Sequence, residues 1–330
     1  MERHIPAVRP ILLADIGGTN ARFALLRDGD YGPIERASVA DHPTAIDAIA
    51  EFLAHYAKDT PVATGILGVA GVVDQEHCKI TNSGWTLDAD ELRAAFGLHA
   101  VHLLNDFEAL AWSVPHLKPA DLFAVRRGQA VVGAPVLLVG PGTGFGVSCL
   151  LSPPDAGRII VSEAAHSTLP AASRQDDAVI ELLRRRFGHV SVERVLSGAG
   201  LQNLYDALAT ARGEEVAARD AAAITGAALE GSCETSRATL DMFCAVLGTV
   251  AGNLALTFCA RGGVYIGGGI VTRFPEYLAR SDFAARFSAK GRFRDYLQSI
   301  PVQLITRADA AFVGLKAFAE NRATVVVETG

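Results

Sequence analysis

The apolar positions in the first third of the chain form short runs that predict a sheet. Residues 11–16 are an apolar run that ends at two glycines, which is typical of a buried strand. Residues 21–26 have the pattern of a second strand, so Gly17-Gly18 is predicted to be the turn of a hairpin. Further strands are expected at residues 63–69 and 101–104, and helices at residues 44–56, about 88–96 and 106–112.

The strand–turn–strand pattern returns in the middle of the chain. Residues 136–139 and 147–151 flank a second glycine-rich turn, and the wide spacing between the two patterns predicts one duplicated α/β lobe rather than a solenoid. The remaining predicted elements are helices at residues 177–187, 200–211, 217–229 and 235–259, strands at 264–266 and 302–305, and a last helix at 308–320. The final apolar residues, 323–330, are too few to place.

Nothing in the sequence resembles a linker rich in Pro, Gly or Ser. We therefore expect two lobes that share a cleft rather than two separate beads. The predicted small α/β domain covers residues 1–110 and is joined by the C-terminal helix, about 307–330. The predicted large α/β domain covers residues 111–306.

Composition limits the function. Of 330 residues, 50% are hydrophobic and 20% are charged, which permits a large core and excludes general disorder. A net charge of −6 argues against a nucleic-acid or anionic membrane surface. Five cysteines without a C-x-x-C pair predict reduced, mostly buried thiols. The apolar stretch 244–260 contains Asn253 and two glycines and predicts a buried helix, and the first residues do not resemble a signal peptide, so we expect a cytoplasmic protein without a membrane partner.

The first glycine turn carries side chains suited to phosphate. Gly17 and Gly18 allow the backbone to approach a phosphate closely, and Thr19-Asn20 add side-chain donors. Asp15, at the strand end, could hold Mg²⁺ through water. Gly-Gly alone is common in ordinary hairpins, and the flanking polar residues are what favour a functional turn.

The second turn, residues 140–146, has four glycines with Thr143 at its centre. It is neither a G-x-G-x-x-G turn opening a helix nor a Walker A motif, and it predicts a phosphate nest within a hairpin, although hairpin glycines are usually structural. A glycine triplet, Gly267-Gly268-Gly269, follows a predicted buried strand. It would let a flat base or ribose lie against the backbone, or would merely serve as a flexible turn.

Asp106 is the candidate general base. Phosphoryl transfer to an alcohol needs a carboxylate that accepts the hydroxyl proton, and an ordinary Asp is ionised at neutral pH. Asn105 offers both a donor and an acceptor for sugar hydroxyls. The alternative is that either residue only caps the following helix.

Three further polar residues suit a hydroxylated ligand. A carboxylate can accept two hydroxyl protons from a vicinal diol, and an imidazole can accept or donate. Glu163 and His166 are three residues apart and can converge on one ligand, while Glu193 would by itself be read as a surface helix start. Hydrogen bonds from these side chains to ligand hydroxyls would discriminate strongly against analogues that lack one of those hydroxyls.

Taken together, these motifs resemble the zinc-free bacterial glucokinase family of the hexokinase/actin/Hsp70-like superfamily, over nearly the whole chain. The resemblance is carried by residues 15–22, Thr81-Asn82 with Trp85, residues 105–107, 140–144, Ser162-Glu163 with His166, residues 188–191 and 193–198, 263–266 and 268–271.

The resemblance implies a two-lobed actin-like ATPase (ribonuclease H-like) fold with duplicated α/β domains around a central cleft. It implies ATP-dependent phosphorylation of glucose at its 6-hydroxyl, with Mg²⁺, by a homodimer. By motif match, Asp106 is the catalytic base, and the sugar contacts are Asn82, Asn105, Asp106, Glu163, His166 and Glu193. The implied nucleotide contacts are Ala14, Asp15, Ile16, Gly17, Gly18, Thr19, Asn20, Gly142, Thr143, Gly144, Gly268 and Gly269, with Asp15 also at the metal.

The chain departs from the family pattern at two places. Ala165 stands where the family usually has glycine, and its methyl would either crowd the sugar or shift a turn. The segment 308–314 has fewer glycines than expected for nucleotide-base contacts. The cysteine-rich zinc motif of ROK sugar kinases is absent from the sequence.

Other functions remain open at this point. A sugar-sensing regulator would need a helix-turn-helix, and only about ten residues precede the first predicted strand. An actin-like ATPase would have no use for the sugar-reading residues. Another hexose could replace glucose, and polyphosphate could supplement ATP.

Overall fold

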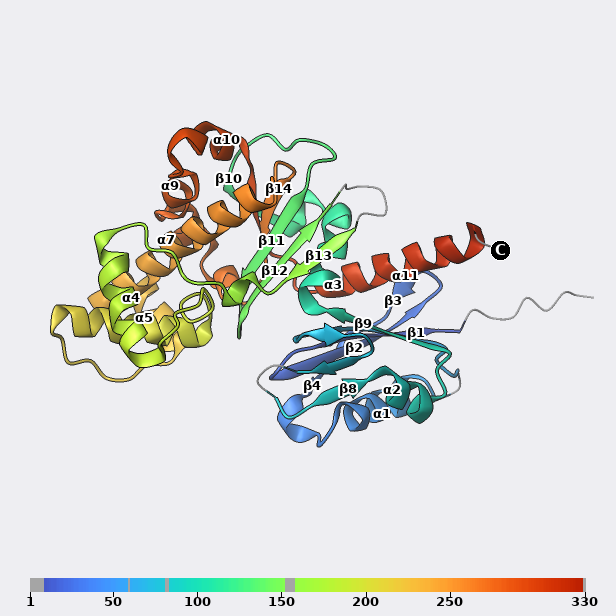
Figure 1. Ribbon diagram of the computed structural model, residues 1–330. Coiled ribbons are helices and arrows are strands. Elements are labelled where there is room, and N and C mark those ends of the chain that lie inside the picture. The colour runs from blue at the N-terminus through green and yellow to red at the C-terminus, as the bar shows by residue number, and fades with distance from the viewer. Residues whose placement is uncertain (1–8, 59, 81–82, 152–157, 329–330) are drawn as a thin grey trace, which may run out of the picture. The chain divides into compact units, whose positions relative to one another are not determined.

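The computed structural model describes residues 9–58, 60–80, 83–151 and 158–328 (Figure 1). Contacts between residues divide the chain into two compact units, which we call unit 1 and unit 2. Unit 1 comprises Met1–Leu117 and Ala308–Gly330, and unit 2 comprises Lys118–Arg307. Unit 1 is therefore built from two stretches of chain, and unit 2 from one.

Unit 1 is built on a mixed sheet with the strand order β3-β2-β1-β5-β9, and β4 also pairs with β2. Strands β1 and β2 form an antiparallel hairpin, whereas β5 and β9 run parallel to β1. A separate three-stranded sheet, β6-β7-β8, lies in the same unit. The bounds are β1 Ile11–Ile16, β2 Asn20–Arg27, β3 Asp30–Tyr31, β4 Glu35–Ser38, β5 Thr64–Val69, β6 Val73–Asp74, β7 His77–Lys79, β8 Thr86–Asp88 and β9 Ala100–Asn105.

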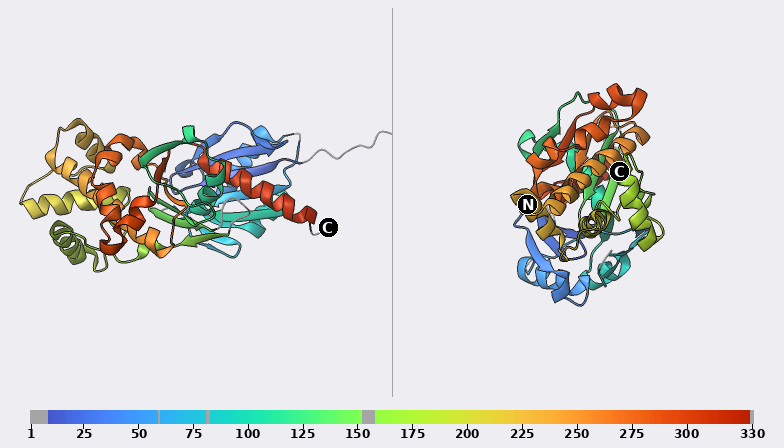
Figure 2. Two further views of the ribbon diagram at one scale, coloured as in Figure 1. Left: turned by 90° about the horizontal axis from the view of Figure 1, so that it is seen from above. Right: turned by 90° about the vertical axis from the view of Figure 1, so that its left-hand side faces the viewer.

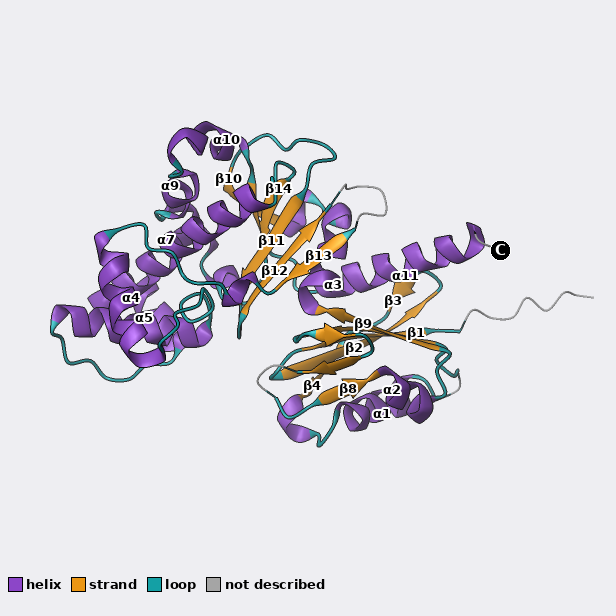
Figure 3. Cartoon of the chain, viewed as in Figure 1, coloured by secondary structure: helices purple, strands orange, loops and turns teal. Residues whose placement is uncertain are grey.

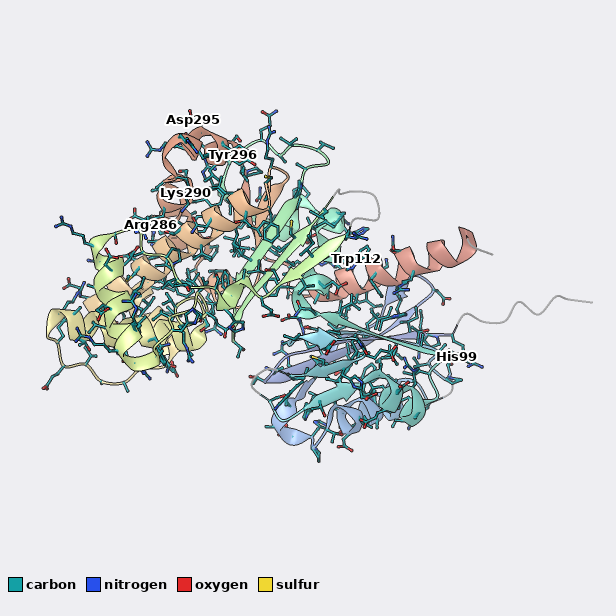
Figure 4. The ribbon with its side chains drawn as sticks, viewed as in Figure 1. His99, Trp112, Arg286, Lys290, Asp295 and Tyr296 are labelled. Atoms are coloured by element: carbon teal, nitrogen blue, oxygen red, sulfur yellow. The ribbon has the colours of Figure 1, made fainter. Side chains whose placement is uncertain are left out.

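Helices cover both faces of the main sheet of unit 1 (Figures 1 and 2). Helices α1 (Ala45–Tyr56) and α2 (Ala89–Phe96) lie on one face, and their apolar residues share a core with β1, β2 and β5. Helices α3 (Asp106–Ser113) and α11 (Ala310–Glu328) lie on the other, where Phe312 and Leu315 are fully buried. In Figure 4, Trp112 lies where α3 and α11 come together, and its ring packs edge-on to Phe318.

Unit 2 repeats this plan in its own sheet, which has the order β10-β15-β14-β11-β12-β13. Strands β11 and β12 form an antiparallel hairpin, and β14 and β15 continue parallel to β11 (Figure 3). The bounds are β10 Leu122–Arg126, β11 Val136–Pro141, β12 Phe145–Leu150, β13 Ile159–Ser162, β14 Gly263–Ile266 and β15 Val302–Ile305. The predicted duplication is thus confirmed strand by strand, with β1, β2, β5 and β9 matching β11, β12, β14 and β15.

Unit 2 differs by a large helical part. Its helices are α4 Arg174–Phe187, α5 Gly198–Arg212, α6 Ala221–Glu230, α7 Glu234–Thr257, α8 Pro275–Arg280, α9 Phe283–Ser288 and α10 Arg294–Ser299. Helix α7 is long and apolar enough to cross a membrane, but 78% of its most apolar stretch is buried inside the unit, as expected for a core helix. Gly248 and Gly252 allow α9 to pack on α7, because a Cβ at either position would lie within 2.3 Å of a carbonyl oxygen of Phe283 or Phe287.

Polar contacts fix the same helix pair. Arg286 of α9 donates from Nε to Thr249 Oγ1 at 2.9 Å and also pairs with the buried Asp176 of α4. Lys290 donates from Nζ to the Thr249 carbonyl at 3.1 Å, and Figure 4 shows Arg286 and Lys290 next to each other. The buried acid is therefore paired with a cation, which a buried charge requires.

The sequence predicted the longer elements well. Each predicted helix and strand exists within a few residues, and Thr44 and Asp88 serve as the N-caps of α1 and α2. The prediction missed the short strands β3, β4, β6, β7, β8, β10 and β13 and the short helices α8, α9 and α10. The residues 323–328, which could not be placed, continue α11.

Candidate active site

The first glycine turn joins β1 to β2 and is closed by the hydrogen bond from Gly17 N to Asn20 O, 2.9 Å. Its tip exposes Thr19 and Asn20. Asp15 lies directly opposite Arg22 in the hairpin register, and both Nε and Nη2 of Arg22 bind the Asp15 oxygen Oδ2. Arg22 also donates from Nη1 to the Ala308 carbonyl at 2.8 Å, so it links this turn to the start of the C-terminal segment. The turn thus exposes one hydroxyl and one amide side chain at its tip.

Asn105 and Asp106 lie where β9 ends and α3 begins, as the sequence predicted. The Asn105 side chain is the N-cap, because its Oδ1 accepts from Phe107 N at 2.9 Å. Its amide nitrogen donates to Gly71 O at 3.1 Å. Asp106 also accepts from Phe107 N, at 3.0 Å, and is half-buried. Since Asn105 already caps the helix, the Asp106 carboxylate is not needed for that role alone.

Helix α3, which begins at Asp106, packs very closely against α11. A Cβ at Gly314 of α11 would lie 1.7 Å from the Ala109 carbonyl of α3, so only glycine permits this approach. In the sequence, the low number of glycines in residues 308–314 argued against nucleotide-base contacts there. In the structure, Gly314 serves to pack α11 against the helix that carries Asp106.

The second glycine turn, in unit 2, holds Glu193. Phe145 N donates to Glu193 Oε2 at 2.9 Å. A Cβ at Gly144 would lie 2.4 Å from the same oxygen, so the glycine makes room for the carboxylate. Thr143 is exposed at the tip, and Gly142 is closed onto Gly144 O at 2.8 Å. This contact between residues 144–145 and 193 could not be seen in the sequence.

Glu163 and His166 are brought beside Glu193 by a backbone ladder. Glu193 N donates to Ala165 O at 3.0 Å, and Val192 N donates to Ser167 O at 3.0 Å. His166 Nε2 and Glu163 Oε2 are 3.6 Å apart, and their side chains are 61% and 54% exposed, respectively. The structure therefore groups all three predicted sugar-reading residues of unit 2.

Ala165 does not crowd this group. It is 2% exposed and packs into the core of unit 2 with Val192 and Val195. The methyl group that replaces the usual glycine is therefore buried, whereas the Glu163 carboxylate and the His166 imidazole are exposed.

The glycine triplet meets the second turn. Gly268 has φ +90°, and a Cβ there would lie 2.4 Å from the Pro141 carbonyl, so both backbone conformation and space require glycine. Gly269 faces open space. The start of α5 also contacts the second turn, because Gly198 N donates to Gly142 O at 2.9 Å. The sequence predicted this helix start two residues later, at Gly200, although Ser197 before Gly198 is a typical N-cap signal.

Each unit thus carries its own part of the predicted site. Unit 1 holds Ala14, Asp15, Ile16, Gly17, Gly18, Thr19, Asn20, Asn105 and Asp106, and unit 2 holds Gly142, Thr143, Gly144, Glu163, His166, Glu193, Gly268 and Gly269. Asn82, predicted to contact the sugar, lies outside the described residues. Among the described residues, no three His, Cys, Asp or Glu side chains cluster as a metal site would.

Comparison with known proteins identifies the family. The family model described as "Glucokinase" matches residues 12–322. The chain belongs to the glucokinase family. A glucokinase from Nitrobacter hamburgensis is 44% identical over 317 residues, covering 96% of this chain and 98% of that protein.

Solved structures agree with this family. The crystal structure of a glucokinase from an Antarctic psychrotroph superposes with a TM-score of 0.84 at 36% identity, covering 95% of this chain and 99% of that one. A ROK family glucokinase from Streptomyces griseus, solved with glucose and AMPPNP, is 20% identical with a TM-score of 0.66, covers 94% of this chain and 98% of its own, and shares the fold. This glucokinase-family chain therefore has the actin-like ATPase fold that its sequence predicts.

Proposed function

We propose that this chain transfers the γ-phosphoryl group of ATP to the 6-hydroxyl of glucose, with Asp106 as the general base. The observation that carries the proposal is the placement of the described motifs for this reaction on the helices, strands and hairpin turns of a glucokinase-family chain. The base begins α3, one phosphate turn lies in each unit, and the hydroxyl-reading side chains lie together in unit 2.

Asp106 would accept the proton of the attacking hydroxyl as the oxygen bonds to phosphorus. Asn105 supports this role because its side chain already satisfies Phe107 N and Gly71 O, which fixes the backbone beside the base. Positioning accounts for most of the catalytic effect in phosphoryl transfer, and the crossing of α3 and α11 at Gly314 would provide it.

Glu163, His166 and Glu193 would bind the hydroxyls that do not react. Two carboxylates and an imidazole can accept and donate several hydrogen bonds. A sugar that lacks one of these hydroxyls would leave a polar group unpaired and would bind less tightly. Asn82 and Asn105 are proposed as further sugar contacts from the family motif.

ATP would be held by the turns of residues 14–20 and 142–144 and by Gly268 and Gly269. The Mg²⁺ ion that accompanies ATP would be held by Asp15, which fits because Mg²⁺ takes oxygen ligands and needs only one or two carboxylates when phosphates supply the rest. Both bonds from Arg22 reach Oδ2 of Asp15, so Oδ1 is the oxygen that could accept from a metal-bound water. The ion would neutralise the charge of the phosphates.

A coupled assay of ADP release tests the proposal. We expect release to depend on glucose, because the phosphoryl group needs a hydroxyl acceptor. Mannose, fructose and an amino sugar measure strictness for glucose, and polyphosphate in place of ATP tests the donor. Hydrolysis of ATP at the same rate without sugar would instead indicate an ATPase and would contradict the proposal.

Glu163→Gln separates the sugar role from the nucleotide role. We expect the KM for glucose to rise far more than the KM for ATP, because the phosphate turns lie elsewhere in the chain. Equal weakening of both substrates would point to a structural role for Glu163. We further propose a cytoplasmic homodimer, which light scattering on the purified protein and fractionation of cells would test.

A further inference from the structure

Cys233 stands apart from the other cysteines of unit 2. Cys149 and Cys244 are buried, Cys259 is exposed, and Cys233 is partly exposed at the start of α7. Its Sγ is the N-cap of this 24-residue helix and accepts from Ser236 N at 3.5 Å. A sulfur that accepts an N–H at a helix N-terminus is favoured as the thiolate, because the helix end carries partial positive charge.

A second observation points to the same sulfur. Ser236 is fully buried, and its Oγ is one of two buried side-chain polar atoms among the described residues that have no hydrogen-bond partner. Ser236 lies in the first turn of α7, and its hydroxyl faces the Cys233 thiol. An unpaired buried donor is unfavourable, and a thiolate beside it would be the missing acceptor.

Two more groups surround the sulfur. The hydroxyl of the buried Tyr205, on α5, faces it, and Arg219 adds a positive charge nearby. The Ser236 hydroxyl and then the Ser236 N–H lower the pKa of the Cys233 thiol, with smaller contributions from Tyr205 and Arg219, while burial opposes them. The groups that lower the pKa of this thiol are therefore hydrogen-bond donors and a cation.

We propose that Cys233 is a reactive thiolate and a modification site for low-molecular-weight disulfides. The Cys233 thiolate attacks one sulfur of the disulfide, a new S–S bond forms at Cys233, the old S–S bond breaks, and the other half leaves as a thiolate. No net oxidation beyond that carried by the disulfide is needed. This site is separate from the sugar- and phosphate-binding residues proposed above and does not depend on their roles.

Cys259 provides a control within the same chain. It is more exposed than Cys233, and its Sγ donates to the Leu256 carbonyl at 3.8 Å rather than accepting from an N–H at the start of a helix. Accessibility alone would thus make Cys259 react first, whereas stabilisation of the thiolate would favour Cys233.

The test is exchange of the folded, full-length protein with glutathione disulfide at neutral pH, followed by alkylation and mass-spectrometric quantification of each cysteine. We expect Cys233 to react at least about threefold faster than Cys259, because the gain in thiolate fraction exceeds the loss of intrinsic nucleophilicity. An equal or faster reaction at Cys259 would overturn the proposal.

Ser236→Ala sharpens the test. Removing an unpaired buried hydroxyl should leave the melting temperature unchanged or higher, and yet slow the exchange at Cys233 without changing that at Cys259. An unchanged rate at Cys233 in a folded Ser236→Ala variant would show that the hydroxyl does not stabilise the thiolate and would contradict the assignment. Cys233→Ser checks that the modified peptide is the expected one.

Discussion

The hairpins β1–β2 and β11–β12 have the same place in the two units but different chemistry. In unit 1, Asp15 faces Arg22 across the hairpin and the pair closes the end of the turn. At the corresponding place in unit 2, Gly140 faces Gly146, and no side chain joins the two strands there. The space beside that turn is occupied by Glu193, which comes from a different part of the chain.

This difference shows how one duplicated plan could serve two substrates. The hairpin of unit 1 is complete in itself and suits an ion or a phosphate. The hairpin of unit 2 also carries a turn proposed for phosphate, but it holds a distant carboxylate, Glu193, which is proposed to bind hydroxyl groups. Changes in unit 1 should therefore act on catalysis, whereas changes beside the second turn should act on the affinity for sugar.

The largest effect is expected at Asp106. Asp106→Ala should lower kcat by about 10²–10⁴-fold, the usual contribution of a general base. The fold should persist, because Asn105 still caps α3. Steady-state kinetics together with circular dichroism would check both points, and a near-normal kcat would remove Asp106 from its proposed role.

Gly144→Ala probes the hairpin of unit 2. Its methyl would meet the flexible end of Glu193, so the side chain should move with little loss of stability. We expect the KM for glucose to rise about tenfold or more, since a hydrogen bond to a charged group contributes about 1.5–3 kcal/mol. Gly142→Ala is the matched control, because its methyl faces open space. It should leave the KM for glucose unchanged even if the KM for ATP changes, and the same rise in both variants would refute the link to Glu193.

Gly314→Ala tests the support of Asp106 in unit 1. Its methyl would meet the Ala109 carbonyl, a backbone atom that cannot move freely, so we expect a loss of about 1–3 kcal/mol in unfolding free energy and a lower kcat. Gly226→Ala in α6 is the control, since nothing lies near its added methyl. That variant should gain about 0.5–1 kcal/mol. Denaturant titration of both proteins would decide, and equal behaviour would mean that α3 and α11 separate easily.

The smallest effect concerns Glu108 in α3. Burial raises the pKa of Glu108 above its usual value and outweighs a backbone hydrogen bond at Asn105 that lowers it. Because the folded pKa is the higher one, the folded state binds the proton more tightly, and stability falls as pH rises from about 4.5 through the folded pKa. Glu108→Gln should flatten this dependence, whereas Glu215→Gln, at an exposed loop position, should not. Melting temperatures between pH 4 and 8 would measure it, and parallel curves for wild type and Glu108→Gln would contradict it.

Local sequence signals were sufficient for much of the fold and the family. The apolar runs at β1, β5, β11 and β14 and the apolar stretch of α7 are strong because these elements are buried along most of their length. The helical spacing of α1 is clear because it buries one face. The motif around Asp106 was found because strand, polar pair and helix follow one another directly. Short strands such as β4 and β10 were missed because only a few of their residues are buried, so they have no clear apolar period.

Features that depend on distant contacts could not be predicted. The sequence could not show that Ala165 would be buried, since the residues that form this core come from many parts of unit 2. Likewise, Gly314 looks like an ordinary helix glycine in the sequence. Only the structure shows that a Cβ there would lie 1.7 Å from the Ala109 carbonyl oxygen of α3. Glu193 was identified by resemblance, but its support by the second hairpin was not.

The composition of unit 1 from two stretches of chain has a consequence for synthesis on the ribosome. Residues 118–307 are contiguous, so unit 2 can fold as soon as its own last strand, β15, has emerged. Unit 1 is made first but lacks α11, whose Phe312 and Leu315 fill one face of its sheet. Its apolar face therefore stays uncovered until the residues of α11 have been made, and during that interval the nascent chain would be a client for chaperones that bind exposed apolar strands.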